Sequence, residues 1–219
     1  ICGKPAMFLA RHGYGHTIAP HDVNYRANIW AMWHKGATGI VSVASVGGIR
    51  ADLAPGDIVI PHQIIDYTWG RKSTYHEGEG CTVTHVDFTE PYDRCLRQMI
   101  LLAASDVGVP AHPGSVYAAT QGPRLETAAE INRLERDGAD VVGMTGMPEA
   151  VLARELGVPY AALNLIANYA AGRADSKDGI SFEAIEGVLR ESMQRVRLII
   201  ERLAACYENG CAAGSNPPD

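Results

Sequence analysis

The chain has 219 residues, 47% hydrophobic and 20% charged, which suits one α/β domain and excludes a disordered protein. Its net charge of −6 argues against nucleic-acid binding, because that function needs a basic face. No apolar run approaches the roughly 20 residues that span a bilayer, and the first residues lack the regions of a signal peptide. We therefore expect a cytoplasmic protein without membrane or nucleic-acid partners.

The cysteines and histidines indicate neither a disulfide framework nor a metal site. The chain has five cysteines, an odd number that cannot all pair, and none of them has Cys-x-x-Cys spacing. We therefore expect reduced thiols. Among the eight histidines only His12 and His16 have the i, i+4 spacing of helical metal ligands. Gly13 and Gly15 lie between them and disfavour a helix. We therefore expect no metal and no cofactor.

In the first half of the chain, apolar and β-branched runs alternate with segments of helical period. The predicted strands are residues 6–10, 39–48 and 58–60, with 63–66 as a candidate continuation of the third. The predicted helices are residues 23–35 and 91–107. In the first helix, Ala27, Trp30 and Ala31 share the apolar face. Residues 69–84 are polar and without period, which predicts a long functional loop.

The second half continues the alternation. It predicts strands at residues 112–120, 141–142 and 160–167, and helices at 127–137, 148–156 and 182–208. Alternating strands and helices indicate one α/β domain with a central mixed, twisted sheet and helices on both faces. We place this domain at residues 1–209 and expect residues 210–219 to form a disordered tail.

Residues 138–149 predict a strand, a glycine-bearing turn and a helix start. Gly143 breaks the strand, and Pro148 suits the first turn of a helix, because its missing N–H costs nothing there. Glu149 follows, where the positive end of the helix dipole favours a carboxylate. The segment is either an ordinary strand-to-helix connection or an anion site built from backbone N–H groups and the Thr145 hydroxyl.

Polar side chains gather at the predicted carboxyl ends of strands, where open α/β sheets bind ligands. The residues in these places are Arg11, His12, Ser45, Gln121 to Arg124, Met144, Thr145 and Asn168. They supply cations, hydroxyls and an amide, but no Ser-His-Asp set, carboxylate pair or metal cluster. Such a set suits the binding of an oxyanion and a polar heterocycle better than covalent or metal catalysis.

Several motifs, in order, resemble the purine nucleoside phosphorylase and methylthioadenosine phosphorylase family. They are Arg11-His-Gly13, Val23 to Asn28, Gly47-Gly48 before Pro55-Gly-Asp57, Gln121-Gly-Pro-Arg124 and Met144-Thr-Gly-Met-Pro-Glu149. The resemblance implies the nucleoside phosphorylase fold and a pentosyltransferase of purine salvage. In this reaction, phosphate attacks the ribose C1′ and a purine leaves. Phosphate is then a co-substrate, and the resemblance further implies a homotrimer with active sites shared between subunits.

The resemblance also assigns roles to single residues. The implied phosphate ligands are Arg11, His12, Thr145 and either Ala44 or Ser45. The implied ribose contacts are Met144 and a partner subunit's equivalent of His85, and the loop position of His16 makes it a further candidate near the sugar. The implied base contacts are Asn168, Leu125 and Ala170.

Two departures from the family pattern bear on the substrate. Asn168 and Ala170 stand where adenosine-type members carry two Asp residues, and an amide can both donate and accept at the N7 and O6 edge of a 6-oxopurine. We therefore expect Asn168 to support the leaving base. Apolar Ile180, Phe182 and Ile185 follow in place of a His for the 5′-hydroxyl, which favours a 5′-methylthio group.

These departures resemble the S-methyl-5′-thioinosine phosphorylase branch, which converts S-methyl-5′-thioinosine and phosphate to hypoxanthine and 5-methylthioribose 1-phosphate. Methylthioadenosine or inosine and guanosine remain alternative substrates. A non-catalytic purine-binding protein and a nucleosidase-type hydrolase remain alternatives of other classes. Family members carry a further strand and a Gly-Gly-[Ser/Thr]-Gly phosphate loop before Ala6, and we expect that the given sequence omits them.

Overall fold

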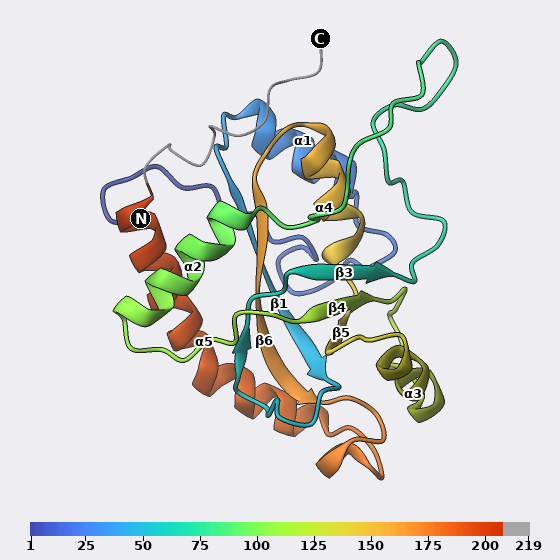
Figure 1. Cartoon of the computed structure of the whole chain (residues 1–219), viewed down its shortest axis with the longest axis vertical. Coiled ribbons are helices and arrows are strands. Elements are labelled where there is room, and N and C mark those ends of the chain that lie inside the picture. The colour runs from blue at the N-terminus through green and yellow to red at the C-terminus, as the bar shows by residue number, and fades with distance from the viewer. Residues whose placement is uncertain (208–219) are drawn as a thin grey trace.

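A computed structural model describes residues 1–207, and in this part of the chain a six-stranded sheet carries helices on both faces (Figure 1). The strands are β1 Ile40–Gly48, β2 Ile58–Val59, β3 Gln63–Asp66, β4 Val116–Ala119, β5 Val141–Gly143 and β6 Tyr160–Tyr169. The helices are α1 Tyr25–His34, α2 Arg94–Asp106, α3 Ala128–Arg136, α4 Gly146–Glu155, the short η1 Ala174–Ser176 and α5 Phe182–Cys206. The predicted α/β class is confirmed, and the predicted tail at 210–219 lies outside the described residues.

The sheet is mixed, in the order β2-β6-β1-β5-β4-β3. The central strands β1 and β6 are parallel, as are β3, β4 and β5, whereas β2 runs antiparallel to β6 and β5 antiparallel to β1. The edge strands β2 and β3 are separated along the chain by residues 60–62 alone. So short a link reaches ~14 Å at most. The sheet therefore curls strongly, which brings its two edges close together.

Two predicted strands differ from the structure. Residues 63–66 do not continue β2 but form β3 at the opposite edge, where they pair with β4. Residues 6–10 form no strand, and Met7 and Phe8 are 48% and 84% exposed. An apolar run becomes a strand only where a neighbour takes up its backbone hydrogen bonds, and the described residues provide no such neighbour here.

Alternation along β6 sorts the core into two layers. Ala161, Leu163 and Leu165 face α2 and α5, whereas Tyr160 and Ile166 face the layer that contains α1 and α4. Figure 1 shows α2 and α5 side by side, away from α1 and α4. The sheet is thus covered on both faces, as predicted.

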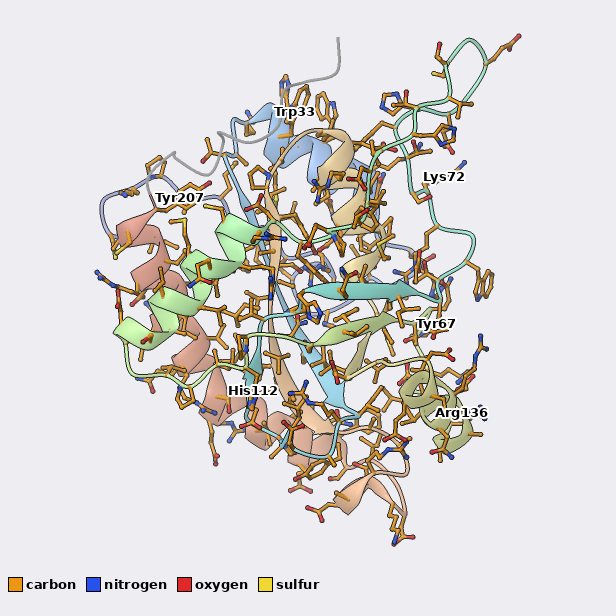
Figure 2. The ribbon with its side chains drawn as sticks, in the orientation of Figure 1. Trp33, Tyr67, Lys72, His112, Arg136 and Tyr207 are labelled. Carbon is orange, nitrogen blue, oxygen red and sulfur yellow. The ribbon has the colours of Figure 1, made fainter. Side chains whose placement is uncertain are left out.

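The predicted apolar face of α1 is wrong, although the helix itself is confirmed. Tyr25 and Ile29 are the buried residues, whereas Ala27, Trp30 and Ala31 are exposed. Two apolar stripes overlap on this short helix, and only packing against α4 selects between them. Trp33 also projects outward, at the end of α1 (Figure 2).

Cysteine pairing departs in part from the expectation of reduced thiols. Cys2, Cys81 and Cys206 are free, but Cys95 is disulfide-bonded. Within residues 1–207, no helix has the length and apolar character needed to cross a membrane.

The turn from β5 into α4 is packed tightly around one buried phenol. The Tyr117 hydroxyl accepts a hydrogen bond from the Thr145 backbone N–H at 3.2 Å. A Cβ atom added at Gly143 would overlap the Tyr117 hydroxyl and ring, and one added at Gly146 would lie 2.9 Å from the same ring. The two glycines therefore let the backbone wrap closely around Tyr117.

We predict that Gly143→Ala lowers the free energy of unfolding by about 1–3 kcal/mol, because the added methyl group overpacks this turn. The matched control is Gly187→Ala in α5, where nothing lies within 4 Å of the added carbon. This control should stabilise the helix by up to about 1 kcal/mol. Urea unfolding of both variants measures the difference. Equal effects of the two substitutions would contradict the packing described for Tyr117.

Candidate active site

A cavity of about 320 Å³ lies at the carboxyl ends of β1, β5 and β6. Figure 1 shows that β1 and β6 finish at the same end of the sheet, as expected for parallel neighbours. The cavity brings together the following predicted site residues: Arg11, His12, His16, Ala44, Ser45, Leu125, Met144, Thr145, Asn168, Ala170, Ile180 and Ile185. Its volume is sufficient for a small organic ligand.

Arg11 is held rigidly at one end of this cavity. Its Nε donates to Glu149 Oε1 at 2.7 Å and its Nη2 to Glu149 Oε2 at 3.0 Å, which forms a bidentate ion pair. Nη2 also donates to Ser42 Oγ at 2.5 Å, and Nη1 donates to the Val43 carbonyl at 3.1 Å. These bonds use four of the five guanidinium N–H groups within the described part of the chain. One Nη1–H is left for a ligand.

Glu149 keeps this guanidinium charged. Burial alone would lower the pKa of Arg11, but the adjacent Glu149 carboxylate raises it above its usual range. Glu149 Oε2 also accepts from the Tyr160 hydroxyl at 2.8 Å, so the carboxylate is anchored to β6. The side chains of Arg11 and Glu149 are only 15% and 6% exposed. A fixed, largely dry cation of this kind is suited to binding an oxyanion.

The two neighbouring histidines belong to a tight loop beside Arg11. His12 Nδ1 lies 2.8 Å from the Ile18 carbonyl, and the rings of His12 and His16 stack at a centroid distance of 4.5 Å. Burial lowers the pKa of His12, which favours the neutral imidazole. Nδ1–H then donates to Ile18 and Nε2 is left as an acceptor. Such a neutral ring can accept a hydrogen bond from the hydroxyl of a monoprotonated phosphate.

Thr145 reaches the cavity through the turn around Tyr117. It is 6% exposed, and its side chain makes no capping bond to α4. The predicted strand, turn and helix start are confirmed, with Thr145 at the N-cap and Glu149 in the first turn. Glu149 has a second role besides its favourable interaction with the helix dipole, because its carboxylate binds Arg11.

A β-bulge determines how Asn168 faces the cavity. Val46 on β1 pairs with Ile166, but the next residue, Gly47, pairs with Asn168, so Ala167 is the extra residue. Consecutive strand residues normally face opposite sides, yet here Ala167 and Asn168 both line the cavity. One Asn168 N–H donates to the Tyr169 carbonyl at 2.7 Å. The other N–H and the amide oxygen are available to a ligand.

Apolar side chains also line the cavity. Leu125, Ala170, Ile180 and Ile185 line it, but Phe182 does not and is 68% exposed. Phe182 is the first residue of α5.

His85 also lies outside the cavity. It is exposed on the segment 67–93, which we call the arm because its middle part projects from the body of the molecule (Figure 1). Its predicted role in another subunit's site therefore stays a prediction.

Sequence reasoning missed Glu126, which lines the cavity and accepts a hydrogen bond from Thr120 Oγ1 at 2.6 Å. Glu126 directly follows Leu125, which the resemblance places beside the base. That position was the signal in the sequence that could have identified Glu126 as a site residue. Arg124, in contrast, forms an exposed ion pair with Glu130 at 2.7 Å, outside the cavity lining. No group of three metal-ligating side chains occurs among residues 1–207.

The cavity lining thus combines a buried cation, polar groups and apolar side chains on one α/β sheet, and the chain belongs to the Phosphorylase superfamily, whose family model matches residues 1–205. It is 49% identical over 201 residues to a Pseudomonas syringae pv. tomato protein named "Probable S-methyl-5′-thioinosine phosphorylase", covering 92% of this chain and 81% of that protein.

Two further similarities extend over most of the chain. The "6-oxopurine nucleoside phosphorylase" of Pyrococcus furiosus is 48% identical over 202 residues, 90% of this chain and 76% of that protein. The structure of methylthioadenosine phosphorylase from Schistosoma mansoni in complex with adenine matches with a TM-score of 0.85 and 31% identity. That match covers 89% of this chain and 74% of the other.

We predict that Glu149→Gln lowers the free energy of unfolding by about 3 kcal/mol, because it leaves the Arg11 charge buried without its counter-ion. The matched control is Glu201→Gln, which breaks the exposed Arg197–Glu201 pair and should cost less than about 0.5 kcal/mol. Chemical unfolding at neutral pH gives both values. A Glu149→Gln variant as stable as this control would show that the buried pair is not structural.

Proposed function

We propose that this chain catalyses the phosphorolysis of S-methyl-5′-thioinosine, with hypoxanthine and 5-methylthioribose 1-phosphate as products. The observation that carries the proposal is the three-part cavity. Its lining includes Arg11, His12 and Thr145, the polar atoms of Asn168 and Glu126, and the apolar side chains of Ile180 and Ile185. The names of the relatives of 49% and 48% identity support the same class of reaction.

In the proposed reaction, phosphate binds at the Arg11 end. The bond between C1′ and the purine nitrogen breaks first, and its electron pair leaves with the base. Phosphate stabilises the positive charge that develops on the sugar and then bonds to C1′ through one oxygen. The proton of the phosphate is transferred to the purine, and the Asn168 amide supports N7 of the departing base. The reaction needs no cofactor, since phosphate itself is the nucleophile.

The polar side chains proposed to contact the base, Glu126 and Asn168, favour a 6-oxopurine. The Glu126 carboxylate can accept from the N1–H of hypoxanthine or guanine, whereas N1 of adenine carries a lone pair and would be repelled. Asn168 can donate an N–H to O6, or its amide oxygen can accept a hydrogen bond from N7–H of the departing base. A site built to hydrogen-bond a particular edge discriminates strongly against a base that leaves its polar groups unpaired.

The sugar end favours a methylthio group. Ile180 and Ile185 line this end and offer no polar atom to a 5′-hydroxyl. An apolar pocket rejects a hydroxyl only weakly, by a factor on the order of 10², so inosine should react slowly rather than not at all.

The first test is purine release from methylthioinosine, methylthioadenosine, inosine and guanosine, each with and without phosphate. We expect phosphate-dependent release of hypoxanthine from methylthioinosine, ahead of inosine by up to about 10². Release without phosphate would identify a hydrolase, and binding without turnover a purine-binding protein. Inosine or guanosine as the best substrate would contradict the proposed role of Ile180 and Ile185.

A second prediction concerns the base edge. Glu126→Gln should lower kcat/KM for methylthioinosine by about 10-fold or more, because the variant loses a charged hydrogen bond to N1–H of the base. The effect on methylthioadenosine should be smaller, since its base has no N1–H. Arg124→Gln is the matched control, because Arg124 is nearby in sequence but pairs with Glu130 outside the cavity lining. Steady-state kinetics with both nucleosides measures the ratio. A parallel loss with both substrates would rule out base recognition by Glu126.

We further infer that the protein is a cytoplasmic homotrimer in which the arm contributes to a neighbouring site. Trp69 and Val83 on the arm are 72% and 73% exposed, and Figure 2 shows Lys72 on the arm, well away from the sheet. Trp30 of α1 is also 45% exposed. Exposed apolar side chains that gather in one patch are typical of surfaces that bind another protein chain.

Subunit mixing tests the shared site. Arg11→Ala and His85→Ala should each reduce activity, and mixed trimers should recover part of it, because some sites then combine intact halves from two chains. Arg11→Ala mixed with Thr145→Ala is the control and should recover nothing, since both residues line one chain's cavity. Sedimentation gives the oligomeric state. A monomer of full activity would overturn the inference.

A further inference from the structure

Arg71 lies near the root of the arm and is hydrogen-bonded to segments that form the cavity. Its Nη1 donates to the Met144 carbonyl at 2.8 Å and to the Met147 carbonyl at 2.6 Å. Its Nη2 donates to the carbonyls of Thr120 and Gln121 at 3.3 and 2.9 Å. One side chain therefore joins the turn after β5 to the end of β4.

These carbonyls flank residues that line the cavity. Met144 precedes Thr145 in the turn and Met147 follows it. The Thr145 backbone N–H donates to the Tyr117 hydroxyl. The turn is thus held from both directions, and its position follows from Arg71 as well as from Tyr117. Thr120 binds the Glu126 carboxylate, so the second contact acts on the other polar edge of the site.

A third connection runs through Tyr25. Arg71 Nη1 lies 3.2 Å from the Tyr25 hydroxyl, and its guanidinium carbon lies 5.3 Å from the centre of the Tyr25 ring. The Tyr25 hydroxyl donates to the Pro20 carbonyl at 2.7 Å, and Pro20 lines the cavity. Arg71 is therefore linked to the loop that also carries Arg11 and His12.

The geometry of these contacts requires a guanidinium. Its donors diverge in a planar fork and reach acceptors on separate segments, whereas a lysine ammonium places three donors on one atom. None of the hydrogen bonds described for Arg71 goes to a carboxylate. The acceptors are four backbone carbonyls and one hydroxyl. Its contacts thus join the polypeptide backbone of different segments rather than a single acidic partner.

We propose that Arg71 is the positioning residue that holds the three cavity-forming segments in one arrangement, and that it thereby couples the arm to the phosphate and base subsites. This inference rests on the proposed phosphorolysis for its kinetic consequences, but its structural part stands apart from the reaction. A displacement of about 1 Å at a catalytic group can cost on the order of a hundredfold in rate, so a residue outside the cavity can govern activity.

The test compares Arg71→Lys with Arg97→Lys in the full chain. Arg97 is the matched control, because it also donates to two backbone carbonyls, but these belong to Pro61 and Pro113, which do not line the cavity. We expect Arg71→Lys to lower kcat/KM for methylthioinosine about 10- to 100-fold and to raise the KM for phosphate. Arg97→Lys should leave both constants near the wild-type values, although both variants lose thermal stability.

Tyr25→Phe provides a second, milder variant. It removes the link to Pro20 but leaves the four carbonyl contacts of Arg71 in place. We expect a smaller kinetic loss than with Arg71→Lys, in the same direction. This variant keeps the proposal testable if Arg71→Lys does not fold.

Hydrogen exchange separates this inference from the proposed function. In Arg71→Lys, the amides of residues 144–147 should exchange faster than in wild type, whereas in Arg97→Lys they should not. If wild-type protein releases no purine, the phosphorolysis proposal fails and exchange alone decides the role of Arg71. Equal exchange and equal kinetics in the two lysine variants would overturn the inference.

Discussion

The bidentate contact between Arg11 and Glu149 is the interaction on which the candidate site depends. It joins a loop near the amino terminus to the first turn of α4, and the Tyr160 hydroxyl extends the contact to the central strand β6. A largely buried guanidinium without this carboxylate would carry an uncompensated charge. With it, the guanidinium is fixed, charged and still able to offer one N–H to a ligand.

The rest of the cavity follows from the way in which strands end. β1 and β6 run parallel and finish together, so residues more than 120 positions apart in the chain, such as Ser45 and Asn168, line one space. The bulge at Ala167 turns Asn168 toward this space. The turn after β5 then brings Thr145 in, held between the Tyr117 hydroxyl and Arg71.

Several features could be predicted from the sequence, for local reasons. The predicted helix at residues 91–107 forms as α2, with Leu96, Ile100 and Ala103 buried, because a 3.6-residue period is a property of the segment itself. The strand, turn and helix start around Thr145 were likewise readable from glycine and proline positions. Motifs compared with a known family, together with the loop position of His16, led from there to twelve residues that the structure gathers at one cavity.

Other features were decided only by tertiary contacts. Residues 63–66 form an edge strand because β4 is beside them, and residues 6–10 form none because the described chain gives them no partner. Glu149 and Arg71 gain their importance from hydrogen bonds to residues distant in the sequence. Local pattern can identify a helix or a turn, but a buried ion pair needs two remote segments to meet, and only the packed sheet brings them together.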